Sequence, residues 1–146
     1  MSCHDFEFND AVTSDVSFVA RGDSLEAVFA AASEALLAST LENPRSVGIR
    51  VRRSVALAEP DLALLLLGFL NELIFLRDAE DLLLRPRELS VSSSPEEGAR
   101  LEVELAGESI DRSRHQLIGE VKAATAHGLE VEPDGRGWRA TVTLDV

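Results

Sequence analysis

One lysine and two aspartates are the residues of this chain best suited by type and position to do chemistry. Lys122 is the only lysine among 14 basic residues, and the rest are arginines. Asp15 and Asp145 lie near opposite ends of the sequence, and two carboxylates that meet repel each other unless a cation or a shared proton intervenes. Oxygen ligands suit a hard ion such as Ca²⁺ or Mg²⁺, to which the main-chain or terminal oxygens of Val146 would add donors. The plainer alternatives are solvated aspartates and a lysine left by chance.

The two aspartates fall on segments that alternate like strands. Residues 16–21 place Val16, Phe18 and Ala20 on one face, and Asp15 falls on the polar face. Residues 138–146 alternate in the same way, and Asp145 falls on their polar face. If these two strands are neighbours, the carboxylates converge.

Two segments have the pattern of helices. Residues 23–39 begin with Asp23 as the expected N-cap and continue as an amphipathic helix. Residues 61–81 are apolar nearly all round except at Gly68, Asn71 and Glu72, so we expect burial against a sheet and the first helix. Asn71 and Glu72 are then expected to have defined partners, the alternative being a thin exposed stripe.

The remaining segments are predominantly extended, with the loop at 107–114 as the main exception. Residues 46–58 alternate and, with Arg45, hold four arginines and no acid before Glu59, which indicates a solvated strand face or a docking patch for an acidic surface. The further strands are expected at 82–93, 101–106, 120–125, 129–132 and 138–146. This order predicts an α/β (α+β) fold with two helices packed on mainly antiparallel sheet, in a single domain spanning 1–146.

Composition narrows the class of protein. The net charge of −12 disfavours stand-alone nucleic-acid binding and favours a basic partner or a bound cation. Cys3 is the only cysteine, the first residues lack a secretion-signal pattern, and the longest apolar run is shorter than a membrane span, so we expect a cytoplasmic protein without membrane contact. No phosphate-binding loop, nucleophile elbow or zinc spacing is present, and His115 and His127 stand apart.

Four segments together resemble the archease family. They are "TSDVSFVARGDSLEAVFAAASEALL", "LLLGFLNELIFLRDAEDLLL", "GESIDRSRHQLIGEVKAATAHGLEV" and "WRATVTLDV", in the order that the family has. The resemblance implies a fold of strand-helix-strand-strand modules, one inserted within another. It also implies an accessory protein that promotes guanylylation and multiple turnover of the GTP-dependent RNA ligase of tRNA splicing, and that touches RNA only indirectly.

The resemblance assigns the site residue by residue. Asp15, Asp145 and Val146 match the family's divalent-cation ligands, and Lys122 matches its lysine, whose compact charge arginine does not replace well beside a phosphate. Two positions depart from the family: Val12 stands where members carry a histidine, and Ala126 where they often carry an aromatic residue.

Three functions follow from these residues. The first is the non-catalytic ligase activator, with Glu120 and His127 beside Lys122 as further functional residues. The second is a divergent metal-binding module of the same fold that serves another partner. The third is a small metal-dependent hydrolase, which needs a general acid or base such as His127 or Glu120. The identity of the metal and the oligomeric state stay open.

Overall fold

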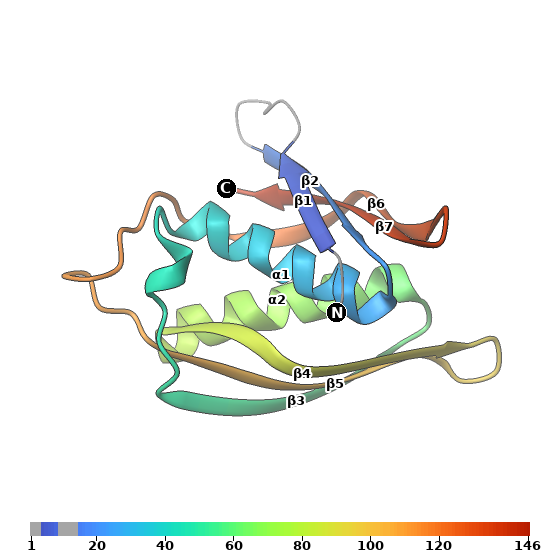
Figure 1. Ribbon diagram of the computed structural model, residues 1–146, viewed down its shortest axis with the longest axis horizontal. Coiled ribbons are helices and arrows are strands. Elements are labelled where there is room, and N and C mark those ends of the chain that lie inside the picture. Colours follow the sequence, from blue (N-terminus) through green and yellow to red (C-terminus); the bar gives the residue numbers. More distant parts are fainter. Residues whose placement is uncertain (1–3, 9–14) are drawn as a thin grey trace.

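The computed structural model describes residues 4–8 and 15–146 (Figure 1). The elements in chain order are β1 (His4–Phe8), β2 (Asp15–Gly22), α1 (Leu25–Thr40), the 3-10 turn η1 (Pro44–Ser46), β3 (Val51–Glu59), α2 (Leu62–Glu80), β4 (Leu82–Ser94), β5 (Gly98–Ser109), β6 (Ala123–Asp134) and β7 (Gly137–Asp145). Within these ranges, no helix combines the length and hydropathy needed to cross a membrane.

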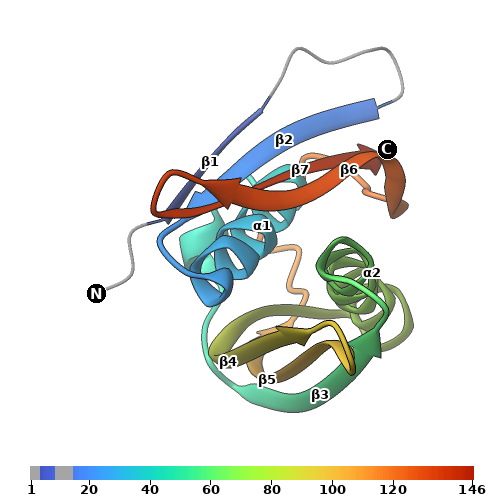
Figure 2. The same cartoon turned by 90° about the vertical axis from the view of Figure 1, so that its right-hand side faces the viewer.

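The described elements form three layers. One antiparallel sheet has the strand order β1-β2-β7-β6, and the other has the order β3-β5-β4. The helices α1 and α2 lie between the two sheets, which Figure 2 shows from the end. This arrangement confirms the predicted fold class. Each helix packs against both sheets.

The connectivity repeats one pattern twice. In the larger sheet, β2 is followed by α1 and later by β6 and β7, and the strand order is β2-β7-β6. The segment from β3 through α2 to β4 and β5 is inserted between α1 and β6, and its order β3-β5-β4 is the same. The expected insertion of one strand-helix-strand-strand module within another is therefore confirmed.

The position of α2 explains why its sequence is apolar nearly all round. Leu65, Leu66, Phe69 and Leu70 are completely buried, because the helix contacts both sheets as well as α1. Each large apolar side chain removed from water contributes about 1.5–3 kcal/mol. The ring of Phe69 stacks on that of Phe29 in α1 with centroids 6.1 Å apart, which joins the two modules in one core.

Both helices begin at a side-chain cap. Ser24 caps α1 by accepting the Ala27 N–H at 3.0 Å, and Asp61 caps α2 by accepting the Leu64 N–H at 2.9 Å. The prediction that Asp23 caps α1 is wrong by one residue, because Ser24 is the residue three positions before the donated N–H. The chain leaves α2 through Asp81, whose φ of 60° is left-handed.

Several strand boundaries differ from the sequence prediction. The amino-terminal strand β1 was not expected. The strand β5 continues to Ser109, whereas the sequence predicted an end at 106. The prediction ended early because Ala106, Gly107 and Glu108 are all buried, so the alternation of residue types stops before the strand does. The extended segment expected from residue 46 starts on the last residue of η1, and β3 begins only at Val51.

Candidate functional site

Asp15 and Asp145 are direct neighbours across two strands. In the β2–β7 register Asp15 lies opposite Asp145, and Phe18 lies opposite Val142 three positions further along. Directly opposite residues project from the same face of an antiparallel sheet, with Cβ atoms about 5 Å apart. Phe18 and Val142 are fully buried, so the aspartates project from the opposite, outer face. The prediction that these strands are neighbours is confirmed.

Within the part of the chain that the structure describes, the two carboxylates have no ion-pair partner. Among residues 4–8 and 15–146, neither side chain forms a hydrogen bond or an ion pair, and both are partly exposed. Like charges directly opposite each other destabilise a sheet. The arrangement therefore carries an uncompensated negative charge that a cation would relieve.

The donor set fits a hard divalent cation but is small. Two carboxylates and the main-chain oxygens of Val146 supply oxygen atoms only, which Ca²⁺ and Mg²⁺ prefer. The described part of the chain contains no cluster of three or more His, Cys, Asp or Glu side chains able to hold a metal. An ion held here would thus keep several water ligands and remain open to an incoming anion. Val146 follows β7, and its side chain is 38% exposed.

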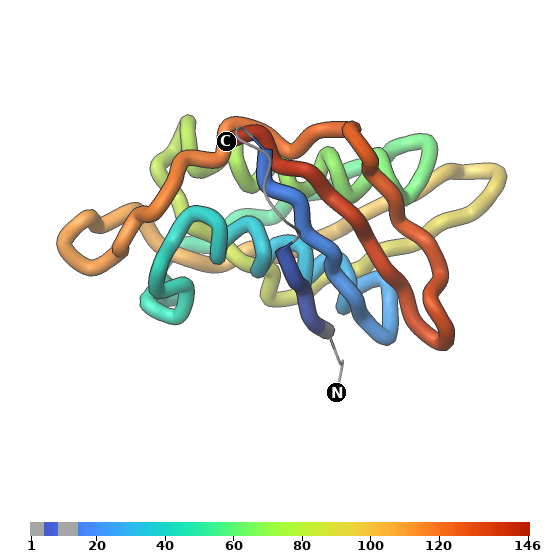
Figure 3. Tube along the Cα trace, turned by 90° about the horizontal axis from the view of Figure 1, so that it is seen from above, coloured from blue at the N-terminus to red at the C-terminus, as the bar shows by residue number. Residues whose placement is uncertain are grey.

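Lys122 lies next to this pair along the neighbouring strand. Its backbone N–H donates to the carbonyl of Asp145 at 2.8 Å, and Ala123, the next residue, is opposite Asp145 in the β6–β7 register. The side chain of Lys122 is exposed. Three separate parts of the sequence thus bring Asp15, Asp145 and the backbone of Lys122 to one end of the larger sheet. This is the end at which the C-terminus is marked in Figure 3.

The chain does not alternate regularly where it enters β6, between Val121 and Ala124. Val121 and Ala124 are both buried, whereas Ala123 and Thr125 are only partly buried. The predicted alternation holds for Ala123 and Thr125, which share one face of β6, but it fails at Val121, and the strand starts at Ala123 rather than at 120. A strict two-residue period cannot bury residues three apart, so the chain must change direction at Lys122.

The helix α2 bonds the backbone on either side of Lys122, at Val121 and at Ala124. The Asn71 carboxamide accepts the Ala124 N–H at 2.9 Å and donates to the Ala124 carbonyl at 3.1 Å. The Arg77 guanidinium donates to the carbonyl of Val121. The expectation of a defined partner is confirmed for Asn71. Glu72, its neighbour, forms no hydrogen bond or ion pair within the described residues.

The structure places Glu120 and His127 at different distances from the aspartate pair. Glu120 is exposed and lines a cleft of about 380 Å³ together with Arg77 and Arg112. His127 is exposed within the irregular stretch of β6, where its N–H donates to Thr125 Oγ1 at 3.4 Å. It follows Thr125, which is opposite Thr143, so in the register it lies beyond the position that faces Asp145. The structure therefore does not bring His127 to the carboxylates.

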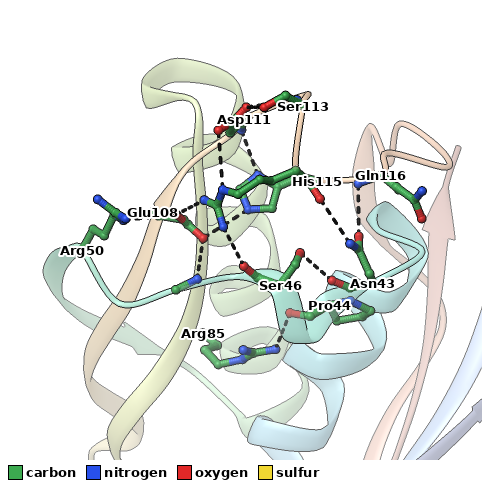
Figure 4. Close-up of polar contacts among 12 residues, drawn as sticks. Asn43, Pro44, Ser46, Arg50, Arg85, Glu108, Asp111, Ser113, His115 and Gln116 are labelled. Carbon is green, nitrogen blue, oxygen red and sulfur yellow. Dashed lines mark hydrogen bonds and ion pairs between the residues drawn. The ribbon is translucent and has the colours of Figure 1, made fainter.

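A second polar cluster surrounds Glu108 and is drawn in Figure 4. The Glu108 side chain accepts the Gly48 N–H, is bonded by the Arg114 guanidinium, and lies 3.2 Å from His115 Nε2. Only 2% of Glu108 is exposed. The Gly48 amide, with Arg114 and His115, lowers its pKa from 4.5 to about 2 and outweighs the opposing effect of burial.

The geometry fixes the tautomer of His115. Its Nδ1 accepts the Asp111 N–H at 2.8 Å, so Nε2 carries the proton and donates to Glu108. Asp111 in turn accepts the amide and hydroxyl of Ser113, which lower its pKa. The segment after β5 is thus closed into a tight loop beside η1, where Asn43 accepts the Gln116 N–H.

Sequence reasoning did not identify this Glu108 cluster as a group. Its members are joined by side-chain bonds to distant backbone, which leave no periodic pattern. The acids missing from the arginine-rich segment also come from elsewhere in the fold: Arg53 pairs with Glu80 at 2.9 Å, and Arg50 lies 3.6 Å from Glu108. These internal pairs agree with the alternative of a solvated strand face.

Comparison with known proteins gives one consistent result. The family model described as the archease protein family matches residues 6–146. A protein archease from Pyrococcus abyssi is 36% identical and covers 92% of this chain and 94% of its own length. A protein archease from Methanothermobacter thermautotrophicus is 33% identical and covers 97% of this chain and 98% of its own.

Two solved structures have a similar fold. The solution structure of a Methanobacterium thermoautotrophicum protein is 32% identical, aligns with a TM-score of 0.81, and covers 97% of this chain and 98% of that one. The crystal structure of an archease from Thermotoga maritima, described as a possible chaperone, is 18% identical with a TM-score of 0.60 and covers 96% and 98%. The second likeness concerns the fold alone.

Proposed function

This chain belongs to the archease family, and from that premise we propose that it activates the GTP-dependent RNA ligase of tRNA splicing. It would promote transfer of guanylate to the ligase and multiple turnover, without turning over a substrate itself. The observation that carries the proposal is the convergence of Asp15, Asp145 and the Lys122 backbone at one sheet end, because these are the positions that match the family's functional residues.

The residues have separable roles in this proposal. The Asp15 and Asp145 carboxylates and the main-chain oxygens of Val146 would hold a divalent cation, Ca²⁺ or Mg²⁺. When bound, the cation supplies a positive centre that attracts phosphate or carboxylate oxygens. Lys122 offers three N–H donors on a flexible stem, which lets one ammonium follow a phosphate as the ligase changes state.

The surface charge supports a protein partner rather than direct RNA binding. A net charge of −12 repels a phosphate backbone, whereas an RNA ligase must carry basic channels that attract an acidic surface. We therefore propose that the chain docks on the ligase and contacts RNA only indirectly.

A second candidate is a module of the same fold that serves a different partner. It is favoured by the two departures from the family, Val12 and Ala126. Val12 lies outside the described residues, and Ala126 is exposed in the irregular stretch of β6. This candidate predicts that the chain binds a divalent cation but does not stimulate the ligase.

One assay separates the two candidates. Ligase guanylylation by GTP is measured with the wild-type chain, with Asp145→Ala, and with the control Asp134→Ala at the far end of β6. The proposal predicts stimulation by the wild type and the control, and none by Asp145→Ala. A wild-type chain that leaves the rate unchanged, while still binding Ca²⁺, would establish the second candidate instead.

A further inference from the structure

The strand β6, which follows Lys122 in the chain, is an edge strand of its sheet. In the order β1-β2-β7-β6, one side of β6 faces β7, and no strand of residues 4–8 or 15–146 pairs with the other side. Backbone groups on such a side lack their usual partners. The backbone groups on the open side of β6 must therefore be satisfied by side chains or by water.

Asn71 takes the place of a neighbouring strand at Ala124. Its carboxamide both accepts the Ala124 N–H and donates to the Ala124 carbonyl, which is the pair of bonds that an adjacent strand would make. Leu70 and Leu73, on either side of Asn71 in sequence, are 0% and 7% exposed, so the helix is anchored in the core. Asn71 thereby ties the start of β6 to the hydrophobic core.

The peptide unit between Val121 and Lys122 is held at both ends. Its carbonyl, from Val121, accepts a bond from Arg77 in α2. Its N–H, from Lys122, donates to the carbonyl of Asp145 in β7 at 2.8 Å. The two groups of one peptide unit point in opposite directions, so these bonds fix the orientation of its plane between the helix and the strand.

Arg77 is itself held in place. Its side chain is only 11% exposed, and its Nε and Nη2 also bond Asp78 Oδ1 at 3.0 and 2.8 Å. A charged donor forms a stronger bond to a carbonyl than a neutral one. The guanidinium therefore fixes the point from which the Lys122 side chain leaves the backbone.

We propose that Asn71 and Arg77 are positioning residues that hold Lys122 beside Asp145. The inference rests on the proposed function of Lys122, but its structural part stands without it. Loss of either side chain leaves the aspartate pair intact and lets the Lys122 backbone move. A small displacement of a functional group lowers a rate by up to about 100-fold.

The test uses the full chain with Arg77→Met and Asn71→Leu, and with Glu72→Gln as the control on the same helix. Hydrogen exchange is measured at the amides of Lys122 and Ala124. Arg77→Met is expected to speed exchange at Lys122 by about tenfold, and Asn71→Leu to do the same at Ala124, since each loses about one net hydrogen bond. Exchange rates equal to those of Glu72→Gln would overturn the proposal.

Stimulation of ligase guanylylation gives the second measurement. Arg77→Met and Asn71→Leu are expected to lower the maximal stimulation about tenfold without raising the half-saturating concentration, because neither substitution removes the aspartate pair or the Lys122 ammonium. Arg77→Lys, which keeps the charge, is expected to restore part of the loss and also serves if Arg77→Met does not fold. Full stimulation by both variants would overturn the proposal. If the wild type itself does not stimulate, the proposed function fails and amide exchange alone decides the positioning role.

Discussion

The buried carboxylate of Glu108 and the outer pair of Asp15 and Asp145 differ in their partners. Glu108 is 2% exposed and is bonded by Gly48, Arg114 and His115. Asp15 and Asp145 are partly exposed, lie opposite each other, and have no hydrogen bond or ion pair among the described residues. A buried carboxylate that accepts hydrogen bonds from its own chain stabilises the fold. Two facing carboxylates that repel each other are suited to bind a cation from solution. Four predictions follow from this difference.

The largest expected effect is the loss of Glu108. Glu108→Ala removes three hydrogen bonds to a buried carboxylate, from Gly48, Arg114 and His115, so we expect the free energy of unfolding to fall by about 4 kcal/mol. Urea denaturation measures the change, with Glu102→Ala on the exposed face of β5 as the control. A fall in the free energy of unfolding of under 1 kcal/mol would contradict the stabilising role of Glu108.

The same carboxylate predicts how stability depends on pH. The pKa of Glu108 is about 2 in the folded chain and 4.5 ordinarily, so the stabilisation is complete above pH 4.5 and is lost as the pH falls from there toward 2. A depression of this size corresponds to about 3 kcal/mol. Denaturation from pH 7 to pH 2.5 should show a steeper decline for the wild type than for Glu108→Gln. Parallel curves would contradict the assignment.

Addition of a cation should affect only the aspartate pair. At Ca²⁺ concentrations about 100 times the dissociation constant, binding to the folded state adds about 2.7 kcal/mol. We expect a raised Tm for the wild type and for Glu108→Gln, and no shift for Asp145→Asn. The opposite pattern, with Asp145→Asn still responsive, would place the cation elsewhere.

The smallest expected effect is a gain in stability without any cation. Asp15→Asn removes one of two facing negative charges, so we expect the metal-free chain to become more stable by about 0.5 kcal/mol. Thermal unfolding in chelator, compared with Asp134→Asn, measures the difference. A destabilised Asp15→Asn variant would show that the carboxylate has a partner of its own.

The elements with a regular spacing of apolar residues could be predicted from the sequence. The alternation around Asp15 and Asp145 predicted two strands with both acids on the polar face, and the apolar pattern of α2 predicted its burial. The expected partner of Asn71 follows from one polar residue on an apolar helix. These predictions depend on burial, which sets the spacing of side-chain types directly.

The remaining contacts could not be derived from spacing. The bonds from Arg77 to Val121 and from Glu108 to Gly48 join residues 44 and 60 positions apart, and one member of each pair contributes only backbone. Backbone groups are the same at every position, so no residue type marks where such a bond ends. For the same reason the break in alternation at Lys122 was not predicted.

The most direct test of the central claim is ligase guanylylation with Lys122→Arg. The variant keeps the positive charge and the backbone bond to Asp145, but it replaces a compact ammonium with a planar fork. We predict that stimulation is abolished while the Tm and the Ca²⁺-dependent shift match the wild type. Wild-type stimulation by Lys122→Arg would contradict the claim that the only lysine of this chain works with the two aspartates.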